Sequence, residues 1–160
     1  MRVNVLGFCH QLPDKLKINN FVAFNYVEHR RQISLVRKAI EMINRVSRGN
    51  LFCNLSFQTL NEEKRSFDDV FNDDDVWISL VKGGVGIAGL SYEKDIGITE
   101  FGFSIAEGRP DPIRHVASII VHEMAHVNGA GDNPDKAEWL LFPCGFINEM
   151  DYGKNGVTDL

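Results

Sequence analysis

The chain has 160 residues, which is enough for one domain with a substantial hydrophobic core. Its hydrophobic content of 44% and charged content of 24% are ordinary for a folded soluble protein, and a net charge of −5 argues against a nucleic-acid-binding surface. No stretch approaches the roughly 18 apolar residues of a membrane span. Residues 1–17 lack the long apolar region of a secretory signal peptide, so we expect cytoplasmic synthesis, with delivery by a signal-independent route left open.

The first 60 residues predict a strand, a helix and a second strand. Residues 2–8 read as the first strand, and residues 28–47 have the three- and four-residue apolar spacing of a helix. Residues 51–60 alternate apolar and polar side chains, which favours a strand. The apolar positions behind these two assignments are Ile33, Val36, Ile40, Ile43 and Val46 in the helix, and Leu51, Cys53, Leu55 and Phe57 in the strand.

The middle of the chain predicts two more strands after a polar segment. Residues 61–75 are acidic and polar and predict a solvated helix or loop, and residues 76–83 predict a buried strand. The glycines of residues 83–92 favour a turn or hairpin that leads into an edge strand. Residues 95–106 predict a further strand. The pattern fits one domain, residues 1–160, of the α/β or α+β class.

The three cysteines Cys9, Cys53 and Cys144 are widely spaced. Because their number is odd and no CxxC pair occurs, they indicate neither a disulfide framework nor a structural zinc site.

A long helix with clear ends follows. Asp111 is a good N-cap, Pro112 stands at the first helical position, and Asn128-Gly129 supplies a stop. Between these ends the segment is apolar enough to be buried.

Two histidines of this helix, His122 and His126, are four residues apart and therefore lie on one face, where their imidazoles can converge on one ion. Glu123 is rotated by about 100° from His122 on the helix. It can reach a water held by that ion without binding the ion, which is the chemistry of the HExxH motif. The other interpretation is two core histidines satisfied by hydrogen bonds. Burying two imidazoles and a carboxylate without a charge partner is costly, which favours the metal.

These residues resemble a known family. HEMAHVNG resembles the active-site helix of the zincin metallopeptidases, and HEMAHVNGAGD resembles the metzincin pattern HExxHxxGxxH/D, with Asp132 at the third-ligand position and Gly129 at the turn. The resemblance implies Zn²⁺, a peptide or protein substrate, and a minimal zincin-like α+β fold with a mixed twisted sheet, a backing helix and the HExxH helix. A weaker resemblance to small bacterial toxin-type metallopeptidases rests on Gly129-Ala130, Ala137-Glu138 and Cys144-Gly145.

Three acids compete for the place of the third ligand. Asp132 has the metzincin spacing, whereas Asp135 and Glu138 belong to a short helix that Asn133 and Pro134 are expected to begin. Glu138 falls on an apolar arc, as in zincins whose third ligand is a glutamate on a following helix. An acid that is not a ligand would cap the short helix or orient a histidine.

Further candidates lie on either side of this region. Met150, followed by Tyr152, resembles a metzincin Met-turn with a tyrosine that donates to the oxyanion; the other interpretation of Met150 is core packing. His115, on the same helix as the motif, is a second candidate for support of the oxyanion.

Residues 83–92 also resemble the GxGLAA segment of peptide deformylases. Those enzymes take a third ligand from a cysteine between this segment and the HExxH helix, but residues 91–121 contain none. Leu90 or Ser91 also stands where a glutamine is expected.

The sequence therefore predicts a zinc-dependent peptidase in which Glu123 is the general base and residues 97–104 form an edge strand for an extended substrate. The alternatives are a non-catalytic binding or immunity-type module on a zincin scaffold and a deformylase-like hydrolase. Glu123 favours the enzyme, because a degenerate scaffold has little need of a carboxylate beside the first ligand. An immunity protein or a larger toxin polypeptide is a further partner to consider.

Overall fold

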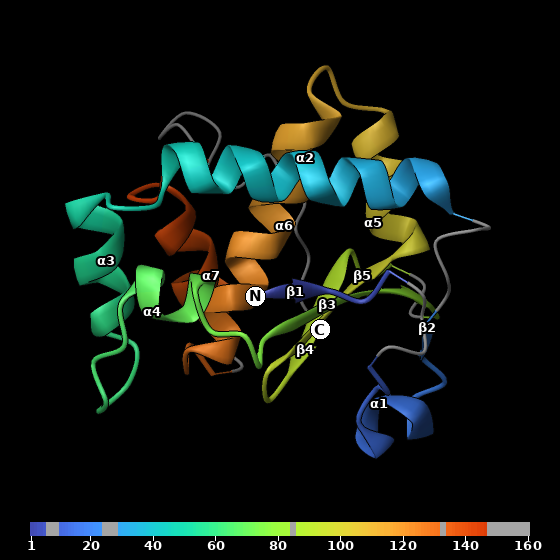
Figure 1. Ribbon diagram of the computed structural model, residues 1–160, viewed down its shortest axis with the longest axis horizontal. Coiled ribbons are helices and arrows are strands. Elements are labelled where there is room, and N and C mark those ends of the chain that lie inside the picture. The colour runs from blue at the N-terminus through green and yellow to red at the C-terminus, as the bar shows by residue number, and fades with distance from the viewer. Residues whose placement is uncertain (6–9, 24–28, 84–85, 132–133, 147–160) are drawn as a thin grey trace.

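The computed structural model describes residues 1–5, 10–23, 29–83, 86–131 and 134–146 (Figure 1). The strands are β1 Arg2–Val3, β2 Val22–Ala23, β3 Trp77–Lys82, β4 Gly89–Tyr92 and β5 Asp95–Thr99. The helices are α1 Asp14–Ile18, α2 Arg30–Val46, α3 Leu51–Gln58, α4 Phe67–Phe71, α5 Glu100–Glu107, α6 Pro112–Val127 and α7 Pro134–Leu141. The fold is α+β, as predicted.

The five strands form one mixed sheet in the order β1-β3-β5-β4, with β2 also paired to β3. β3 runs parallel to β1 and β5, whereas β4 is antiparallel to β5 and β2 is antiparallel to β3. β1 is shorter than the strand predicted at residues 2–8, part of which lies outside the described residues. β4 is an edge strand: within the described part of the chain, β5 is its one pairing partner.

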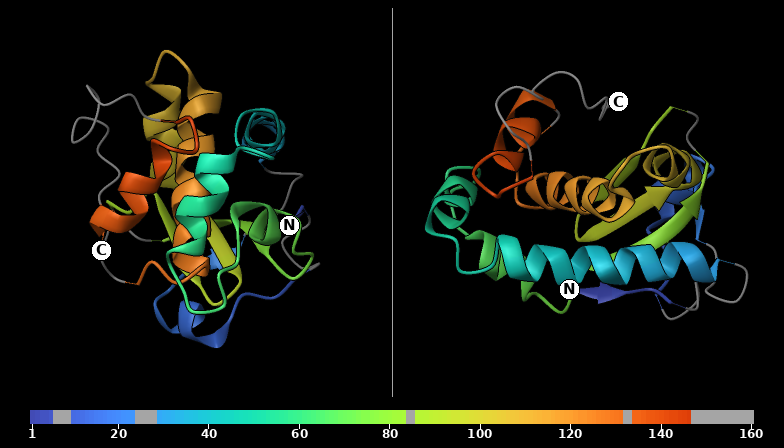
Figure 2. Two further views of the ribbon diagram at one scale, coloured as in Figure 1. Left: turned by 90° about the vertical axis from the view of Figure 1, so that its left-hand side faces the viewer. Right: turned by 90° about the horizontal axis from the view of Figure 1, so that it is seen from above.

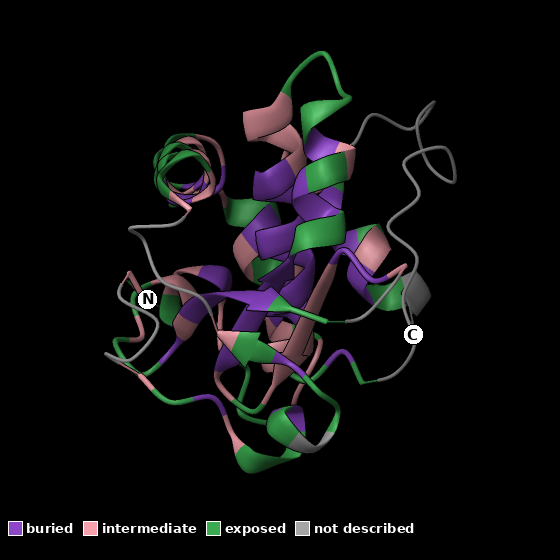
Figure 3. Ribbon diagram, turned by 90° about the vertical axis from the view of Figure 1, so that its right-hand side faces the viewer, coloured by how far each residue is buried: buried purple, intermediate pink, exposed green. Residues whose placement is uncertain are grey.

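Helix α6 contacts both the sheet and the long helix α2. It packs against β4 and β5, and α2 crosses it (Figures 1 and 2). Figure 3 shows α2 end-on, buried on its inner face and exposed on the outside, while buried residues gather in the centre of the fold. The buried face of α2 consists of Ile33, Val36, Ala39 and Ile43. The predicted backing helix is confirmed.

The ends of α6 are those that the sequence predicts. The Asp111 carboxylate accepts a hydrogen bond of 2.9 Å from the backbone N–H of Arg114, and Pro112 opens the helix. At the other end Gly129 takes a φ of 98°, which favours glycine. The buried Asn128 donates to the carbonyls of Phe57 and Arg65 at 2.9 and 3.0 Å. These bonds fix the C-terminal end of α6 to α3 and to the segment that follows it.

The strand predicted at residues 51–60 is wrong, because Leu51–Gln58 form helix α3. Asn50 caps this helix: its side-chain oxygen accepts from the N–H groups of Phe52 and Cys53 at 3.0 and 3.2 Å. Cys53 and Phe57, four residues apart, are its buried positions. The sequence favoured a strand because the apolar residues of this segment also alternate with polar ones.

The strand predicted at residues 95–106 is correct only for its first part, β5. The Thr99 hydroxyl accepts from the N–H of Gly102 at 3.0 Å and begins helix α5. The edge strand predicted at residues 97–104 is therefore wrong, since half of that segment is helical and β5 lies between β3 and β4. The polar segment at residues 61–75 contains the short helix α4, which begins with a capping box formed by Ser66 and Asp69.

The structure also pairs two cysteines that the sequence did not predict to pair: Cys53 of α3 is disulfide-bonded to Cys144, which follows α7. Two hydrogen bonds support this junction. The Ser47 hydroxyl donates to the Cys144 carbonyl at 2.7 Å, and the Asn50 amide donates to the Pro143 carbonyl at 3.2 Å. The pairing depends on packing between segments 91 residues apart, which cysteine spacing alone does not reveal.

Among the described residues, no helix combines the length and the apolar character needed to cross a membrane.

Replacing both Cys53 and Cys144 by alanine should lower the free energy of unfolding by about 2–4 kcal/mol, because the bond closes a long loop in the unfolded chain. A fall in Tm of about 5–15 °C should follow. Thermal unfolding with and without dithiothreitol measures the effect, and Cys9→Ala, which keeps the pair, is the control. An unchanged Tm of the parent protein under dithiothreitol would mean that the bond does not form in solution.

Candidate active site on helix α6

The two histidines of the motif face each other on α6. The Nε2 atoms of His122 and His126 lie 3.1 Å apart, and the ring centroids are 4.8 Å apart. His122 is fully buried, whereas His126 is half-buried and lines a cleft. The helical spacing predicted from the sequence thus brings two ring nitrogens to one point.

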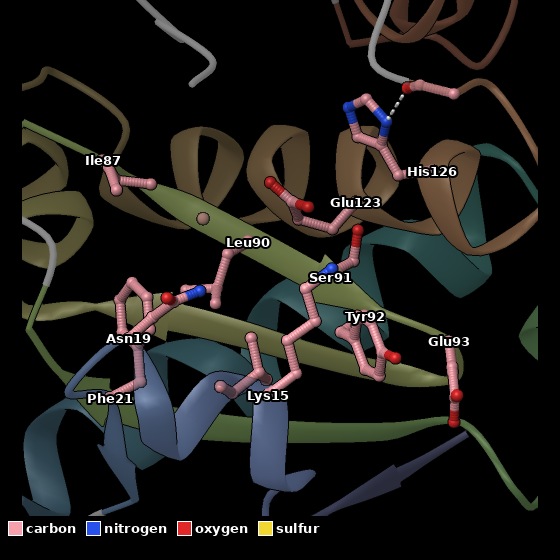
Figure 4. A pocket seen from close by; sticks show the side chains of 13 residues that line it. Lys15, Asn19, Phe21, Ile87, Leu90, Ser91, Tyr92, Glu93, Glu123 and His126 are labelled. Carbon is pink, nitrogen blue, oxygen red and sulfur yellow. Dashed lines mark hydrogen bonds between the residues drawn. The ribbon is translucent and has the colours of Figure 1, made fainter.

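A turn after α6 fixes the proton on His126. Gly129 and Gly131 have φ values of 98° and 67°, and the Gly131 carbonyl lies 2.7 Å from Nδ1 of His126 (Figure 4). Because a carbonyl oxygen only accepts, Nδ1 carries the proton, and Nε2 faces His122. This contact orients the ring in the way that outer acceptors orient metal-binding histidines.

Glu138 of α7 lies on the other side of His122. Its Oε1 is 3.9 Å from Nδ1 of His122, and its side chain is 20% exposed. This separation is within ion-pair distance but longer than a hydrogen bond. Of the roles considered for Glu138, this position beside Nδ1 favours the acid that orients a histidine.

The other candidate ligands are Asp132 and Asp135. Asp132 lies outside the described residues, and of Asp135 the structure describes only the backbone at the start of α7. Within the described residues, no group of three or more His, Cys, Asp or Glu side chains is gathered as a metal site. Cys53 and Cys144 are bonded to each other, so neither can take the role of the deformylase cysteine.

Glu123 lies where β4 approaches α6 most closely. It is only 4% exposed, and a Cβ placed on Gly89 would come within 2.7 Å of its Oε1 and within 2.6 Å of Cγ2 of Ile119. Only glycine allows the strand to pass over the helix at this distance. The glycine-rich segment was recognised in the sequence, but its contact with Glu123 was not.

A cleft of about 430 Å³ runs along β4. Figure 4 shows Glu123 and His126 on the α6 side of this strand, and Lys15 and Asn19 of the α1 region on the other side. The cleft therefore connects the general-base candidate and one histidine with the free edge of the sheet.

The further candidates are His115, Met150 and Tyr152. His115 lies seven residues before His122, a distance of about 10 Å along the helix, and does not line the cleft. Burial, together with the charge of Arg109, lowers the pKa of His115. Met150 and Tyr152 lie outside the described residues.

Fold and site together define an α+β protein in which an HExxH helix is buried beneath the edge strand of a mixed sheet. Comparisons of the chain with protein-family models, with curated proteins and with solved structures gave no match.

Gly89→Ala should lower the free energy of unfolding by about 1–3 kcal/mol, because the new methyl group overlaps Ile119 and displaces Glu123. The matched control is Gly108→Ala, whose Cβ would meet no atom closer than 3.4 Å. We expect the control to stay within about 0.5 kcal/mol of the parent. Urea unfolding measures both, and equal stability of the two variants would contradict the close packing of β4 on α6.

The roles of the three acids can be separated by zinc competition titration. Removing a ligand should weaken zinc binding severely, whereas removing an acid that orients a histidine should cost about 10–100-fold in affinity. We expect Asp132→Ala to be the weakest binder and Glu138→Ala to fall in the second class, with Asp135→Ala beside them for comparison. If Glu138→Ala loses zinc and Asp132→Ala retains it, the ligand set comes from two helices and the metzincin comparison should be dropped.

Proposed function

We propose that this protein is a zinc-dependent peptidase. The observation that carries the proposal is the convergence of the two Nε2 atoms at 3.1 Å, with Nδ1 of His126 held 2.7 Å from the Gly131 carbonyl. At this distance the two nitrogens need either a proton or a metal ion between them, and we propose the metal ion. The glutamate next to the first histidine adds the group that a hydrolase needs.

The donor set fits zinc. Two nitrogens bound to one tetrahedral zinc at 2.0–2.1 Å are about 3.3 Å apart, close to the observed separation of 3.1 Å. His122 and His126 would hold the ion, and Asp132 is the preferred third ligand. When bound, zinc would supply Lewis-acid polarisation of the scissile carbonyl and would acidify a water molecule.

Glu123 would serve as the general base. Its carboxylate would accept a proton from the attacking water and pass it to the nitrogen of the leaving amine. Its burial against Gly89 keeps the carboxylate in one place, at the border of the cleft that holds His126. The role needs a group that touches the cleft from α6 without sharing the face of the histidines, and Glu123 fulfils both conditions.

The free edge of β4 would hold the substrate. An extended peptide can pair with this edge through main-chain hydrogen bonds. Such a peptide would lie in the cleft beside Glu123 and His126. β4 thus takes the role that the sequence had assigned to residues 97–104.

Glu123→Gln in zinc-loaded protein tests the proposal. The amide keeps the shape of the side chain but cannot accept the proton, so turnover of a peptide mixture should fall by about 10²–10⁴-fold. Zinc content should stay at about one ion per chain, measured by elemental analysis. The matched control is Glu41→Gln, the same change at an exposed position of α2, which should leave turnover unaltered.

Two results would reject the peptidase. One is parent protein that takes up no zinc at neutral pH, or takes it up equally well after His122→Ala and His126→Ala. The other is a Glu123→Gln variant that cleaves as fast as the parent. Zinc binding without cleavage of any peptide would favour the non-catalytic module instead.

A further inference from the structure

We propose that the cleft selects peptides that place a glutamate side chain against Lys15 of α1. The inference rests on the proposed function, since it names the substrate class of the same cleft. Two observations support it: the two faces of β4 have different surroundings, and α1 carries the positively charged Lys15 beside the cleft.

The side chains of β4 alternate between two environments. The Cβ position of Gly89 faces Ile119 and Glu123 on α6. Leu90 and Tyr92 pack on the other side, against the smaller apolar cluster formed by Leu12, Leu16, Phe21, Val81 and Ile87. A peptide paired with the free edge of β4 has the same two-residue period. Every second side chain of that peptide would therefore face α1.

Lys15 is the cation on the α1 side of the cleft. Its Nζ lies 5.4 Å from the centre of the Tyr92 ring, and Figure 4 shows the side chain extending from α1 toward β4. Within the described part of the chain, no carboxylate forms an ion pair with Lys15. Lys17 differs, because it pairs with Asp14 at 3.0 Å. Lys15 is thus available to an incoming anion.

The segment that carries α1 is anchored to the sheet. The His10 ring stacks on Trp77 with a centroid distance of 4.7 Å, and its Nε2 lies 2.5 Å from a carboxylate oxygen of Asp95. Leu16 and Phe21 are buried in the apolar cluster below β4. Lys15 is consequently presented by a fixed part of the fold.

The surroundings favour glutamate over other acidic groups. Its two methylene groups can cover the ring of Tyr92 while the carboxylate reaches the ammonium of Lys15. Glu93, an acidic residue that lines the same cleft, points away from Lys15 in Figure 4. A lysine at the same substrate position would instead meet a like charge.

The test uses a synthetic library of random ten-residue peptides. Zinc-loaded protein digests the library, and mass spectrometry of the products gives the ratio of Glu to Lys at each position around the cleaved bond. We expect one flanking position with a ratio of about three to ten, the scale of an exposed ion pair plus the repulsion that it replaces. Lys15→Gln should reduce this ratio to about one. Lys17→Gln, the same change on the same helix outside the cleft, should preserve it.

A binding arm separates this inference from the peptidase. The same library is passed over immobilised Glu123→Gln protein, with and without Lys15→Gln, and the retained peptides are sequenced. Cleavage without Glu enrichment, or with enrichment that survives Lys15→Gln, overturns the inference and leaves the peptidase standing. Lys15-dependent retention of Glu peptides without any cleavage supports the inference and rejects the peptidase. Neither cleavage nor enrichment overturns both.

Discussion

The burial of α6 is the constraint on which the rest of the structure depends. Its residues from Val116 to Ala125 are all buried, so the helix is covered on every side. Three of the buried side chains, Ser118, His122 and Glu123, are polar, and burying such groups without partners costs several kcal/mol. The elements that cover α6 must therefore also satisfy its polar groups. Glu138 of α7 lies 3.9 Å from Nδ1 of His122, and the Gly131 carbonyl of the turn after the helix lies 2.7 Å from Nδ1 of His126.

The parts of the fold that were predicted correctly are those with local signals. α6 has an N-cap, a proline at its first position and a glycine after its end. These residues predict where the helix begins and ends. β3 is a short apolar run between polar segments. The prediction failed at α3 because the apolar residues of this segment fit both a strand and a helix. The hydrogen bonds that begin the helix come from one capping residue, Asn50. The strand-to-helix change at Thr99 was missed for the same reason.

In the candidate site, too, some features follow from local sequence spacing and others depend on the packing of distant segments. His122, Glu123 and His126 lie within two helical turns, so their arrangement follows from helical geometry alone. The position of Glu138 beside Nδ1 of His122 requires the packing of α7 on α6, which no spacing rule supplies. The same holds for β4: the glycines indicated a close approach, but its partner became known only from the fold. The sequence thus indicated the motif residues of α6, but not the elements α7 and β4 that pack against them.

The charges around the two histidines support the proposed zinc ion. Glu138 lies near Nδ1 of His122 and Glu123 is its neighbour on α6, so two carboxylates flank two imidazoles in a mostly buried region. A proton shared by the two Nε2 atoms would compensate one negative charge, whereas a divalent ion compensates both. Imidazole nitrogens favour zinc over magnesium or calcium, which prefer oxygen ligands. Ligands must also lose protons before they bind a metal, so the ion and the proton compete for the same lone pairs. The Gly131 carbonyl, 2.7 Å from Nδ1 of His126, would keep one proton on that nitrogen and so direct Nε2 toward the proposed ion.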